Sequence, residues 1–335
     1  MSSASASAVQ LLLEEAGSLC VGHSPFEINR LMRGAYSHLF AARGNCSAPR
    51  FGALVLTGLD MALWDLAGKA TGRAVHELLG GAVRDRIQYF GFPQGETAEE
   101  LAREAKQWAD KGCAVIYAKV GRSEELDLSI ARQIRAVIGS KRLRLDANEA
   151  WDVLTARRMI RALAEFDIEF IEQPTKSDSL AALAQVRAAS PIAIAADQVV
   201  FTPEDVYAAC SGQAADLITL GLHETGGIGR FCKAAAIAEA AGINLCLHGL
   251  YETGITTCAS NQVGATLANL DDGNQYMNHF LVEDIIERPG LVLEGGQLPV
   301  LSGPGLGFEL DWDAVGRAEE AYRSSCLKPA KPRGQ

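Results

Sequence analysis

The sequence predicts an α/β fold of the (β/α)-barrel type. Short, largely apolar runs recur through residues 115–252, and each is followed by one or two polar residues and then by a helical pattern. Parallel strands that are buried on both faces have such apolar sequences. Three of the runs end at Asp146, Glu172 and Asp197, which are 26 and 25 positions apart. One strand, one loop and one helix need about that length, so the spacing indicates repeated βα units.

The other elements are predicted around this repeat. Residues 9–80 have mostly helical spacing, with the clearest helix at residues 58–69 and a short helix that ends at the double glycine of residues 80–81. Thr97 followed by early acids predicts another helix start. A last helix is expected at residues 314–323, and the polar end after Lys328 is expected to fray. Strands are expected at residues 86–90, 115–119, 142–145, 168–171, 192–196, 217–220, 243–247 and 275–281.

The three acids predict a metal site. The C-terminal ends of the strands converge on one rim of a closed barrel, so side chains that follow successive strands meet there. Carboxylates held that close repel one another unless a cation lies between them, and a ligand set made only of oxygens suits Mg²⁺. The alternative is that Asp146, Glu172 and Asp197 are unrelated helix N-caps, because acids are common where a helix begins after a strand.

Composition and charge exclude several classes of protein. With 335 residues the chain is long enough to bury a large core. A net charge of -10 gives no electrostatic reason to bind nucleic acid or an anionic membrane, and no apolar run is long enough to span a bilayer. The small-residue tail at residues 1–8 lacks the positive region of a secretory signal, and the eight cysteines include no Cys-x-x-Cys pair. We therefore expect a cytoplasmic protein with reduced cysteines and no zinc site.

Four motifs in order resemble the enolase superfamily, and within it the mandelate racemase and muconate lactonizing enzymes. They are Ala-Leu-Trp-Asp-Leu-Ala-Gly-Lys at residues 62–69, Asp-Ala-Asn-Glu-Ala-Trp at 146–151, Ile-Glu-Gln-Pro at 171–174 and Thr-Gly-Gly-Ile at 225–228. The resemblance implies a modified TIM-type barrel at residues 86–300, a capping domain at 1–85 and a C-terminal segment at 301–335 that returns to the cap. The small β-meander with which the family's cap begins has no counterpart in this sequence, so we expect a shortened, mostly helical cap.

The resemblance also implies the chemistry. It assigns Asp146, Glu172 and Asp197 as the ligands of an essential Mg²⁺, and a reaction that begins by removing the proton α to a carboxylate. Lys119, at the end of the second strand, matches the second lysine of the family's Lys-x-Lys pattern and is the expected base, with a surface lysine as the alternative. Tyr117 replaces the first lysine, where it would donate a hydrogen bond or a proton, or simply pack.

Asn148 lies two positions after the first of these ligands. The resemblance matches it to a polar residue that can face the substrate. An asparagine that hydrogen-bonds its own loop is the structural alternative.

The opposite side of the expected site departs from the family. A lysine of the lactonizing branch and an aspartate of the racemase branch, both at the end of the sixth strand, align with Gly221. His248 matches the racemase-branch histidine, but the aspartate that orients it is missing, so His248 is either catalytic or structural. His223 and Glu252 lie nearby and are candidates to bind the substrate or to act as acid or base; each is otherwise a solvated loop residue.

The predicted function is Mg²⁺-dependent abstraction of an α-proton from a small-molecule carboxylate. Dehydration of a hydroxy acid is favoured, because the loss of the sixth-strand group weakens a symmetrical two-base racemase; Lys119 would take the proton and His248 would protonate the leaving hydroxyl. Racemisation or epimerisation and cycloisomerisation are the alternatives, with dipeptide epimerisation disfavoured because the last expected strand lacks Asp-x-Asp. The alternative of another class is a non-catalytic metal-binding relative. The family also suggests a homo-oligomer.

Overall fold

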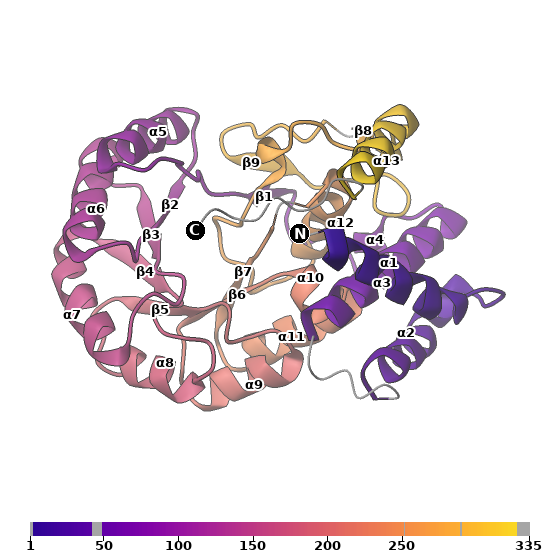
Figure 1. Cartoon of the computed structure of the whole chain (residues 1–335), viewed down its shortest axis with the longest axis horizontal. Coiled ribbons are helices and arrows are strands. Elements are labelled where there is room, and N and C mark those ends of the chain that lie inside the picture. The colour runs from indigo at the N-terminus through magenta and orange to yellow at the C-terminus, as the bar shows by residue number, and fades with distance from the viewer. Residues whose placement is uncertain (1–2, 42–48, 251, 289, 327–335) are drawn as a thin grey trace.

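A curved sheet of six parallel strands lies at the centre of the molecule (Figure 1). The structure is a computed structural model that describes residues 3–41, 49–250, 252–288 and 290–326. Strands that follow one another in the chain are neighbours in the sheet, so each connection is a βα unit. The six runs predicted between residues 115 and 247 are therefore confirmed. The strands are β2 (Val115–Lys119), β3 (Arg142–Asp146), β4 (Ile168–Glu172), β5 (Ala193–Ala196), β6 (Leu217–Leu220) and β7 (Asn244–Leu247).

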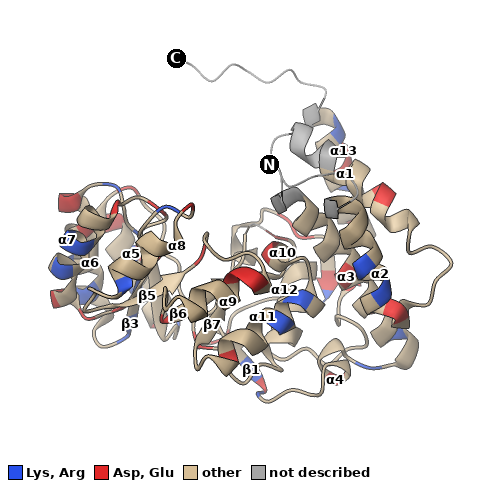
Figure 2. Cartoon of the chain, turned by 90° about the horizontal axis from the view of Figure 1, so that it is seen from below, with Lys and Arg blue, Asp and Glu red and all other residues tan. Residues whose placement is uncertain are grey.

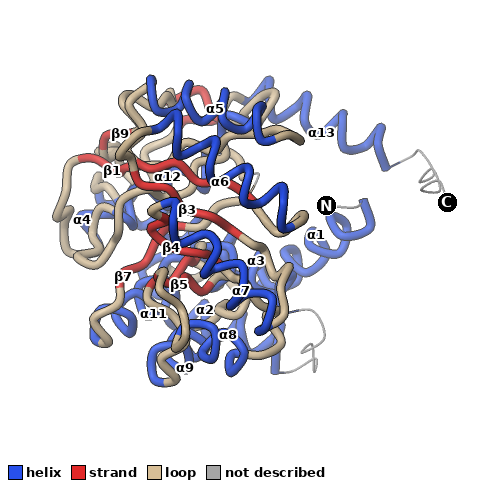
Figure 3. The backbone as a smooth tube through the Cα atoms, turned by 90° about the vertical axis from the view of Figure 1, so that its left-hand side faces the viewer, coloured by secondary structure: helices blue, strands red, loops and turns tan. Residues whose placement is uncertain are grey.

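Helices cover the outer face of this sheet, as Figures 1 and 3 show from two directions. Strand side chains such as Ile116, Leu143 and Leu145 are fully buried against them in one continuous core. Burial on both faces explains the apolar sequences of these strands. The helices are α5 (Ala98–Asp110), α6 (Glu124–Ile138), α7 (Val153–Leu163) with η3 (Ala164–Phe166), α8 (Leu180–Arg187), α9 (Pro203–Ser211), α10 (Leu222–Thr225), α11 (Ile228–Ala240) and α12 (Gly254–Gly264).

Side chains at the helix N-termini explain where the outer helices begin. Each of five outer helices has a hydroxyl or carboxylate side chain that accepts a hydrogen bond from the third backbone N–H of the helix. Thr97 does so for α5, as its sequence context predicts. The capping residues are Thr97, Ser123, Asp152, Ser179 and Thr202. Since Asp146, Glu172 and Asp197 are absent from this set, the N-cap alternative for those acids is wrong.

Two irregular segments link the edges of the sheet. Parallel bridges join residues 89–91 to β2 on one side and to Asn274 on the other, and a further bridge joins Leu270 to β7. The backbone just before, β1 (Arg86–Gln88), instead pairs antiparallel with β9 (Gln297–Pro299). Hydrogen bonds thus run from β7 through residues 270–274 and 89–91 back to β2.

The last strand predicted at residues 275–281 is wrong. The pairing segment lies earlier, at residues 270–274, and Asn278–Phe280 form the 3₁₀ helix η4. The sequence Asp-Asp-Gly-Asn at 271–274 is typical of a loop, but its polar groups form hydrogen bonds inside the fold. Asn274 Oδ1 accepts a hydrogen bond from Leu247 N at 2.7 Å, and its Nδ2 donates to Gln88 O at 2.9 Å.

The described part of residues 1–85 is helical, with no strand among those residues. Helix α3 (Pro49–Thr71) contains the predicted helix at 58–69, and Leu39, Val55 and Leu56 belong to a small core separate from the central one. Helix α1 (Ser3–Ser18) corrects the expected tail at residues 1–8, because residues 3–8 belong to this helix; residues 1–2 lie outside the described residues. The other elements are η1 (Pro25–Glu27), α2 (Ile28–Tyr36), η2 (Ser37–Ala41), α4 (Val75–Leu78), β8 (Ile286–Arg288), β10 (Glu309–Leu310) and α13 (Trp312–Cys326).

The helix predicted at residues 314–323 is confirmed, because it lies within α13 (Trp312–Cys326). Helix α13 contacts α1. The end after Lys328 lies outside the described residues. No helix in the described ranges is long and apolar enough to cross a membrane. Figure 2 shows acidic and basic positions mixed over the helices rather than separated on two faces.

A buried carboxylate joins α3 to the start of α11. Asp60 is 3% exposed, and its Oδ2 accepts a hydrogen bond from Gly229 N at 3.3 Å. Gly227 precedes α11 with φ +110°, and a Cβ there would lie 2.5 Å from the Cβ of Asp60. The glycines of the Thr-Gly-Gly-Ile motif therefore let a protein carboxylate reach this helix N-terminus, which a bound anion would otherwise occupy.

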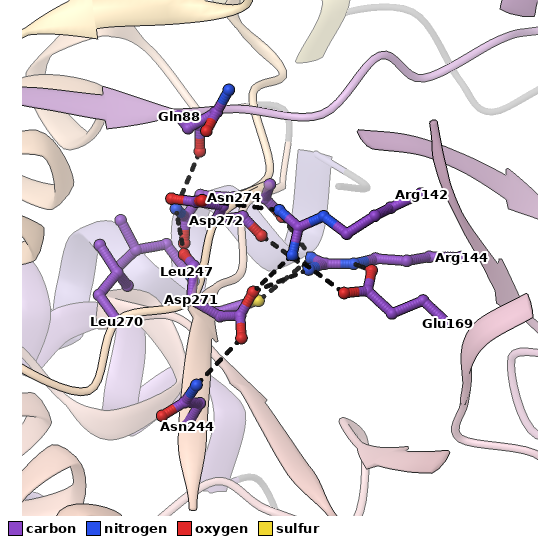
Figure 4. A network of polar contacts seen from close by, with 12 residues as sticks. Gln88, Arg142, Arg144, Glu169, Asn244, Leu247, Leu270, Asp271, Asp272 and Asn274 are labelled. Atoms are coloured by element: carbon purple, nitrogen blue, oxygen red, sulfur yellow. Dashed lines mark hydrogen bonds and ion pairs between the residues drawn. The ribbon is translucent and has the colours of Figure 1, made fainter. Parts of the chain in front are cut away.

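A buried arginine network fills the sheet interior one layer below the strand ends (Figure 4). Arg144 is 1% exposed, yet its guanidinium is surrounded by acceptors. Nε donates to Glu169 Oε2 at 2.6 Å, and Nη2 donates to Asp271 Oδ1 at 3.0 Å. The remaining donors reach the carbonyl oxygens of Asp272 and Gly273, both on the segment that links β7 to β1. The charge of Arg144 thus holds the irregular segment against β3 and β4.

Candidate active site

Five of the predicted site residues lie at the C-terminal ends of strands. In the register of the parallel pairs Lys119 lies beside Asp146, and Asp146 lies beside Glu172. Paired residues of neighbouring strands point to the same face of a sheet, so these side chains enter the interior together. Asp197 directly follows β5, and His248 directly follows β7. The fold thus brings together residues that span 130 positions of sequence.

The three carboxylates are buried, and two of them meet at the hydroxyl of Tyr117. Asp146 is 0%, Glu172 2% and Asp197 1% exposed. Tyr117 Oη lies 2.7 Å from Asp146 Oδ2 and 2.8 Å from Glu172 Oε1. A phenol has one proton, so it can donate to only one of these oxygens at a time. Tyr117 is therefore a polar partner of the site, and its ring also stacks on Phe90 with centroids 4.4 Å apart.

The charge of this cluster fits a divalent cation. Burial, with the charge of Asp146, raises the pKa of Glu172 to about 7. Burial also raises the pKa of Asp197, although His248 opposes the shift. Asp197 Oδ1 is buried without a hydrogen-bond partner among the described residues. Three convergent oxygen ligands, one of them unsatisfied, are the donor set that Mg²⁺ prefers.

Lys119 forms an ion pair with Asp146 Oδ2. Its side chain is 40% exposed, so it lies at the mouth of the site with its ammonium on the carboxylates. Burial lowers the pKa of Lys119, but attraction to Asp146, Glu172 and Asp197 outweighs that effect and raises it. The surface-lysine alternative does not describe a side chain held on a buried acid.

Two further polar side chains fix the carboxylates, and sequence reasoning missed both. Gln173 Oε1 accepts a hydrogen bond from Asp197 N at 3.0 Å, while its Nε2 donates to Thr175 O at 2.8 Å. Thr219 Oγ1 donates to Glu172 Oε2 at 3.2 Å. The only sequence signal was that Gln173 directly follows Glu172; nothing local marks Thr219.

Asn148 bonds its own loop. Its backbone N–H donates to Asp146 Oδ1 at 2.7 Å, and its exposed side chain approaches Asp146 Oδ2 only at 3.5 Å. The residue has φ 47°, a left-handed conformation that asparagine tolerates. Asn148 is thus at the mouth of the site, where its free amide can still face a ligand.

His248 has a carboxylate partner that the sequence analysis did not identify. Its Nδ1 lies 2.9 Å from Glu224 Oε1 and 3.3 Å from Asp197 Oδ1. Burial lowers the pKa of His248, but Asp197 and Glu224 more than offset this and raise it well above the usual value. The expectation that Gly221 leaves the histidine without an orienting acid is therefore wrong, because Glu224 reaches it from three positions further on.

His223 fills the space above Gly221. A Cβ at position 221 would lie 2.5 Å from His223 Cε1 and 2.6 Å from its Nδ1, so a larger residue at 221 would displace the imidazole. Burial lowers the pKa of His223 to about 4, so it is neutral near pH 7. The ring centroids of His223 and His248 are 5.6 Å apart. His223 is a partly buried neighbour of the site on α10, with its side chain 13% exposed, and not a solvated loop residue.

Glu252 also lies near this side of the site. Its Oε2 is buried without a hydrogen-bond partner in the described part of the chain, and burial raises its pKa to about 7. The solvated-loop alternative for Glu252 is therefore wrong as well.

A second group of potential metal ligands lies beside the carboxylates. His223, Glu224 and His248 offer ligand atoms within 4.8 Å of one another. Two imidazole nitrogens suit zinc or another transition metal better than Mg²⁺. The oxygen set of Asp146, Glu172 and Asp197 fits Mg²⁺ better.

Comparisons with known proteins identify the family of this chain. Residues 100–314 match the family model described as enolase C-terminal domain-like, and residues 2–80 match the mandelate racemase / muconate lactonizing enzyme N-terminal domain. Muconate cycloisomerase 1-1 of Acinetobacter lwoffii is 34% identical over 265 residues, which are 78% of this chain and 69% of that protein. The chain belongs to the enolase superfamily. Its branch is that of mandelate racemase and muconate lactonizing enzyme.

Further relatives lie in the same superfamily. The L-Ala-D/L-Glu epimerase of Clostridium acetobutylicum is 32% identical over 259 residues, which cover 71% of each chain. A dipeptide epimerase structure from Cytophaga hutchinsonii, in complex with Mg and the dipeptide D-Ala-L-Val, superposes with a TM-score of 0.84 at 25% identity and covers 92% of this chain and 82% of that one. As a member of this enolase superfamily branch, the protein is an Mg²⁺-dependent enzyme of the lyase or isomerase type.

Proposed function

We propose that this protein is a racemase or epimerase that moves the proton α to the carboxylate of a small molecule. The observation that carries the proposal is that two acid–base side chains flank the carboxylate trio in strand order. Lys119 ends β2, the trio ends β3 to β5, and His248 follows β7. Each lies next to a different acid of the trio: Lys119 forms an ion pair with Asp146, and His248 Nδ1 lies 3.3 Å from Asp197 Oδ1. Two such groups are what a proton transfer between the two faces of one carbon needs.

The residues would divide the work as follows. Lys119, as the free amine, takes the α-proton from one face of the substrate, and His248, as the imidazolium, returns a proton to the other face. In the reverse direction the two exchange roles, so protons balance over each cycle. When bound by Asp146, Glu172 and Asp197, Mg²⁺ would stabilise negative charge on the substrate's carboxylate oxygens and offset the charge of its ligands. Asn148 and Glu252 remain candidates for substrate contacts at the mouth.

Dehydration of a hydroxy acid, the reaction favoured by the sequence, loses its main argument. That preference rested on a missing partner for the second acid–base group, and Glu224 supplies one at 2.9 Å. Cycloisomerisation stays the second candidate, because a relative at 34% identity is a muconate cycloisomerase. Dipeptide epimerisation, which the sequence disfavoured, is again a candidate reaction, because a relative at 32% identity is an L-Ala-D/L-Glu epimerase.

The domain division remains part of the proposal. We infer that residues 1–85 cap a closed (β/α) barrel at 86–300, and that residues 301–335 return to the cap. The match of residues 2–80 to the N-terminal domain of the family and the contact of α13 with α1 support this division. Self-association into a homo-oligomer is proposed from the family resemblance, and light scattering on the purified protein tests it.

The test is proton NMR in D₂O with Mg²⁺ against four groups of carboxylates. These are N-succinyl amino acids, dipeptides, cis,cis-muconate and hydroxy acids. The proposal expects the α-proton of an amino-acid derivative to exchange with solvent as its configuration inverts. Lys119→Ala and His248→Asn should each slow inversion by roughly 10²–10⁴-fold, the range for loss of a general acid or base. Lys106→Ala, which removes an exposed lysine paired with Asp110, is the matched control and should leave the rate unchanged.

Other outcomes are equally informative. Lactone formation from muconate without inversion of any amino-acid derivative would replace the proposal with cycloisomerisation, and loss of water from a hydroxy acid would restore dehydration. If Mg²⁺ binds but no carboxylate reacts or exchanges, the proposed activity is wrong and the non-catalytic alternative stands.

A further inference from the structure

The turn after β6 presents one carboxylate to two different donors. Glu224 is 7% exposed and lies on α10. Its Oε2 accepts a hydrogen bond from Gly221 N at 2.6 Å, as the acid of a capping box does. Its Oε1 lies 2.9 Å from His248 Nδ1. Both oxygens of Glu224 therefore act as acceptors at the same time.

The chemistry of the pair decides which ring nitrogen carries the proton. An ionised carboxylate can only accept hydrogen bonds, so the atom that faces Oε1 has to be a donor. Attraction to His248 and His223, together with the bond from Gly221, lowers the pKa of Glu224 despite its burial, so the carboxylate is ionised near pH 7. His248 Nδ1 therefore carries a hydrogen. His248 Nε2 has no hydrogen-bond partner among the residues that the structure describes.

We propose that Glu224 is the positioning residue that keeps a hydrogen on Nδ1 of His248, in the imidazolium and in the neutral ring, and so leaves Nε2 as the atom that exchanges a proton with the substrate. This inference rests on the proposed function for the role of Nε2, but the hydrogen on Nδ1 can be measured without turnover. Glu224 thus supplies, from a helical turn, the acid that residue 221 does not supply.

Asp197 cannot hold the tautomer equally well. Its Oδ1 is farther from Nδ1, at 3.3 Å, and has no hydrogen-bond partner among the described residues. As a ligand of Mg²⁺, Asp197 would also commit its oxygens to the cation, whereas Glu224 lies outside the set of Asp146, Glu172 and Asp197. His223 packs over Gly221 and closes this side of the site, so the short turn of residues 221–225 supplies both the packing and the acid.

The decisive variant is Glu224→Gln, because an amide has one acceptor and one donor end. Gly221 N–H can only donate, so the amide oxygen should turn to it and the amide NH₂ should face His248 Nδ1. Nδ1 then has to accept, and the proton moves to Nε2. In serine proteases the equivalent change of an orienting acid to its amide leaves the geometry in place but fixes the wrong tautomer.

The measurement is a long-range ¹H–¹⁵N spectrum of the Mg²⁺-loaded protein labelled at its six histidines, with the His248 signals assigned by their loss in His248→Asn. We expect a hydrogen on Nδ1 in the wild type, and on Nε2 alone in Glu224→Gln. A bare Nδ1 in the wild type overturns the inference without any variant, as does a spectrum that Glu224→Gln leaves unchanged.

Glu77→Gln is the matched control. Glu77 also stands at the third position of a four-residue helix, α4, and its Oε2 accepts a hydrogen bond from Ala74 N at 2.9 Å. Its substitution removes the same kind of cap without touching the site, so the His248 signals should not move. A shift in both variants would mean that general loosening, not the Glu224 contact, sets the tautomer.

Turnover gives a second readout. With a carboxylate that the wild type inverts, Glu224→Gln should slow the step that needs His248 by about as much as His248→Asn, while solvent exchange from the Lys119 face continues. An equal loss of proton exchange at both faces of the substrate's α-carbon would contradict a role of Glu224 that is specific to His248. If no carboxylate reacts, the proposed function fails while the spectrum still decides the tautomer.

Discussion

Two buried polar clusters share strand β3, and they differ in the balance of acids and bases. The lower cluster is the network around Arg144 inside the sheet, and the upper cluster is the group of acids around Asp146 at the strand ends. Arg144 and Asp146 are two residues apart and therefore lie on the same face of the strand. Around Arg144 every described donor finds an acceptor, and Arg144 and Arg142 together balance the carboxylates of Glu169 and Asp271 (Figure 4). Around Asp146 acids outnumber the bases, and one buried oxygen of Asp197 has no hydrogen-bond partner among the described residues.

The difference separates a structural network from a site that needs a ligand. A fully satisfied buried network stabilises a single arrangement of the chain, whereas unpaired buried carboxylates oppose folding. Burial, together with the charge of Asp146, raises the pKa of Glu172 to about 7, as expected for an acid in such a cluster. Four substitutions test this comparison.

Arg144→Met should cost about 3–5 kcal/mol of stability, the range for removing one partner of a buried ion pair. Glu169 and Asp271 would keep only the partly exposed guanidinium of Arg142 as a cationic partner. Urea unfolding followed by tryptophan fluorescence measures the loss. A variant as stable as the wild type would show that the lower cluster is not structural.

Asp197→Asn should separate stability from metal binding. It removes one repelling charge, so the metal-free variant should melt no lower than the metal-free wild type. Mg²⁺ at 100 times its Kd should stabilise the wild type by about 2.7 kcal/mol and the variant by far less. Thermal melts with Mg²⁺ or EDTA test this, with Asp152→Asn, an acid that caps α7, as control. An equal Mg²⁺ response in wild type and Asp197→Asn would contradict the ligand assignment.

Asp60→Asn should flatten the pH dependence of stability, because Asp60 is a buried acid that accepts backbone hydrogen bonds and has no ion pair among the described residues. Burial raises its pKa from 3.8 to about 7. Between these values the unfolded state has lost the proton that the folded state keeps. The free energy of unfolding is therefore highest below pH 3.8, and it falls by up to about 1.4 kcal/mol per pH unit as the pH rises towards about 7.

The corresponding measurement compares urea midpoints of wild type and Asp60→Asn. The urea midpoint of the variant should rise relative to that of the wild type between pH values of about 4 and about 7, and the difference should then stay constant at higher pH. A difference that does not change with pH would mean that Asp60 ionises in the folded protein as it does in the unfolded chain.

Arg158→Met should have the smallest effect, below about 1 kcal/mol. Arg158 Nη2 lies 3.1 Å from Glu124 Oε2, but both side chains are at least half exposed, so water already solvates both charges. The same chemical change thus gives a small loss here and a large one at Arg144. Similar urea midpoints for the two variants would contradict the role of burial in the comparison.

Much of the site could be predicted because its signals are local. The alternation of strand and helix, and the acids that follow β3, β4 and β5, depend on residues close in sequence. The Lys119 position follows from the same rhythm. The segment that pairs with β7 at residues 270–274 could not be predicted. Its residues 271–274 are polar, and their hydrogen bonds go to β1 and β7 rather than to neighbours in sequence.

The sequence by itself therefore determined which side chains stand at the strand ends, because periodic burial and strand length are set along the chain. Only the tertiary structure decided how those side chains are paired. Glu224 meets His248 across 24 positions of sequence, and Tyr117 meets Glu172 across 55. A carboxylate that reaches its partner from a turn, in place of the strand position left by Gly221, becomes visible only when β6 and β7 are packed side by side. The physical reason is that a hydrogen bond depends on distance and direction in space, which residue spacing fixes only within one element.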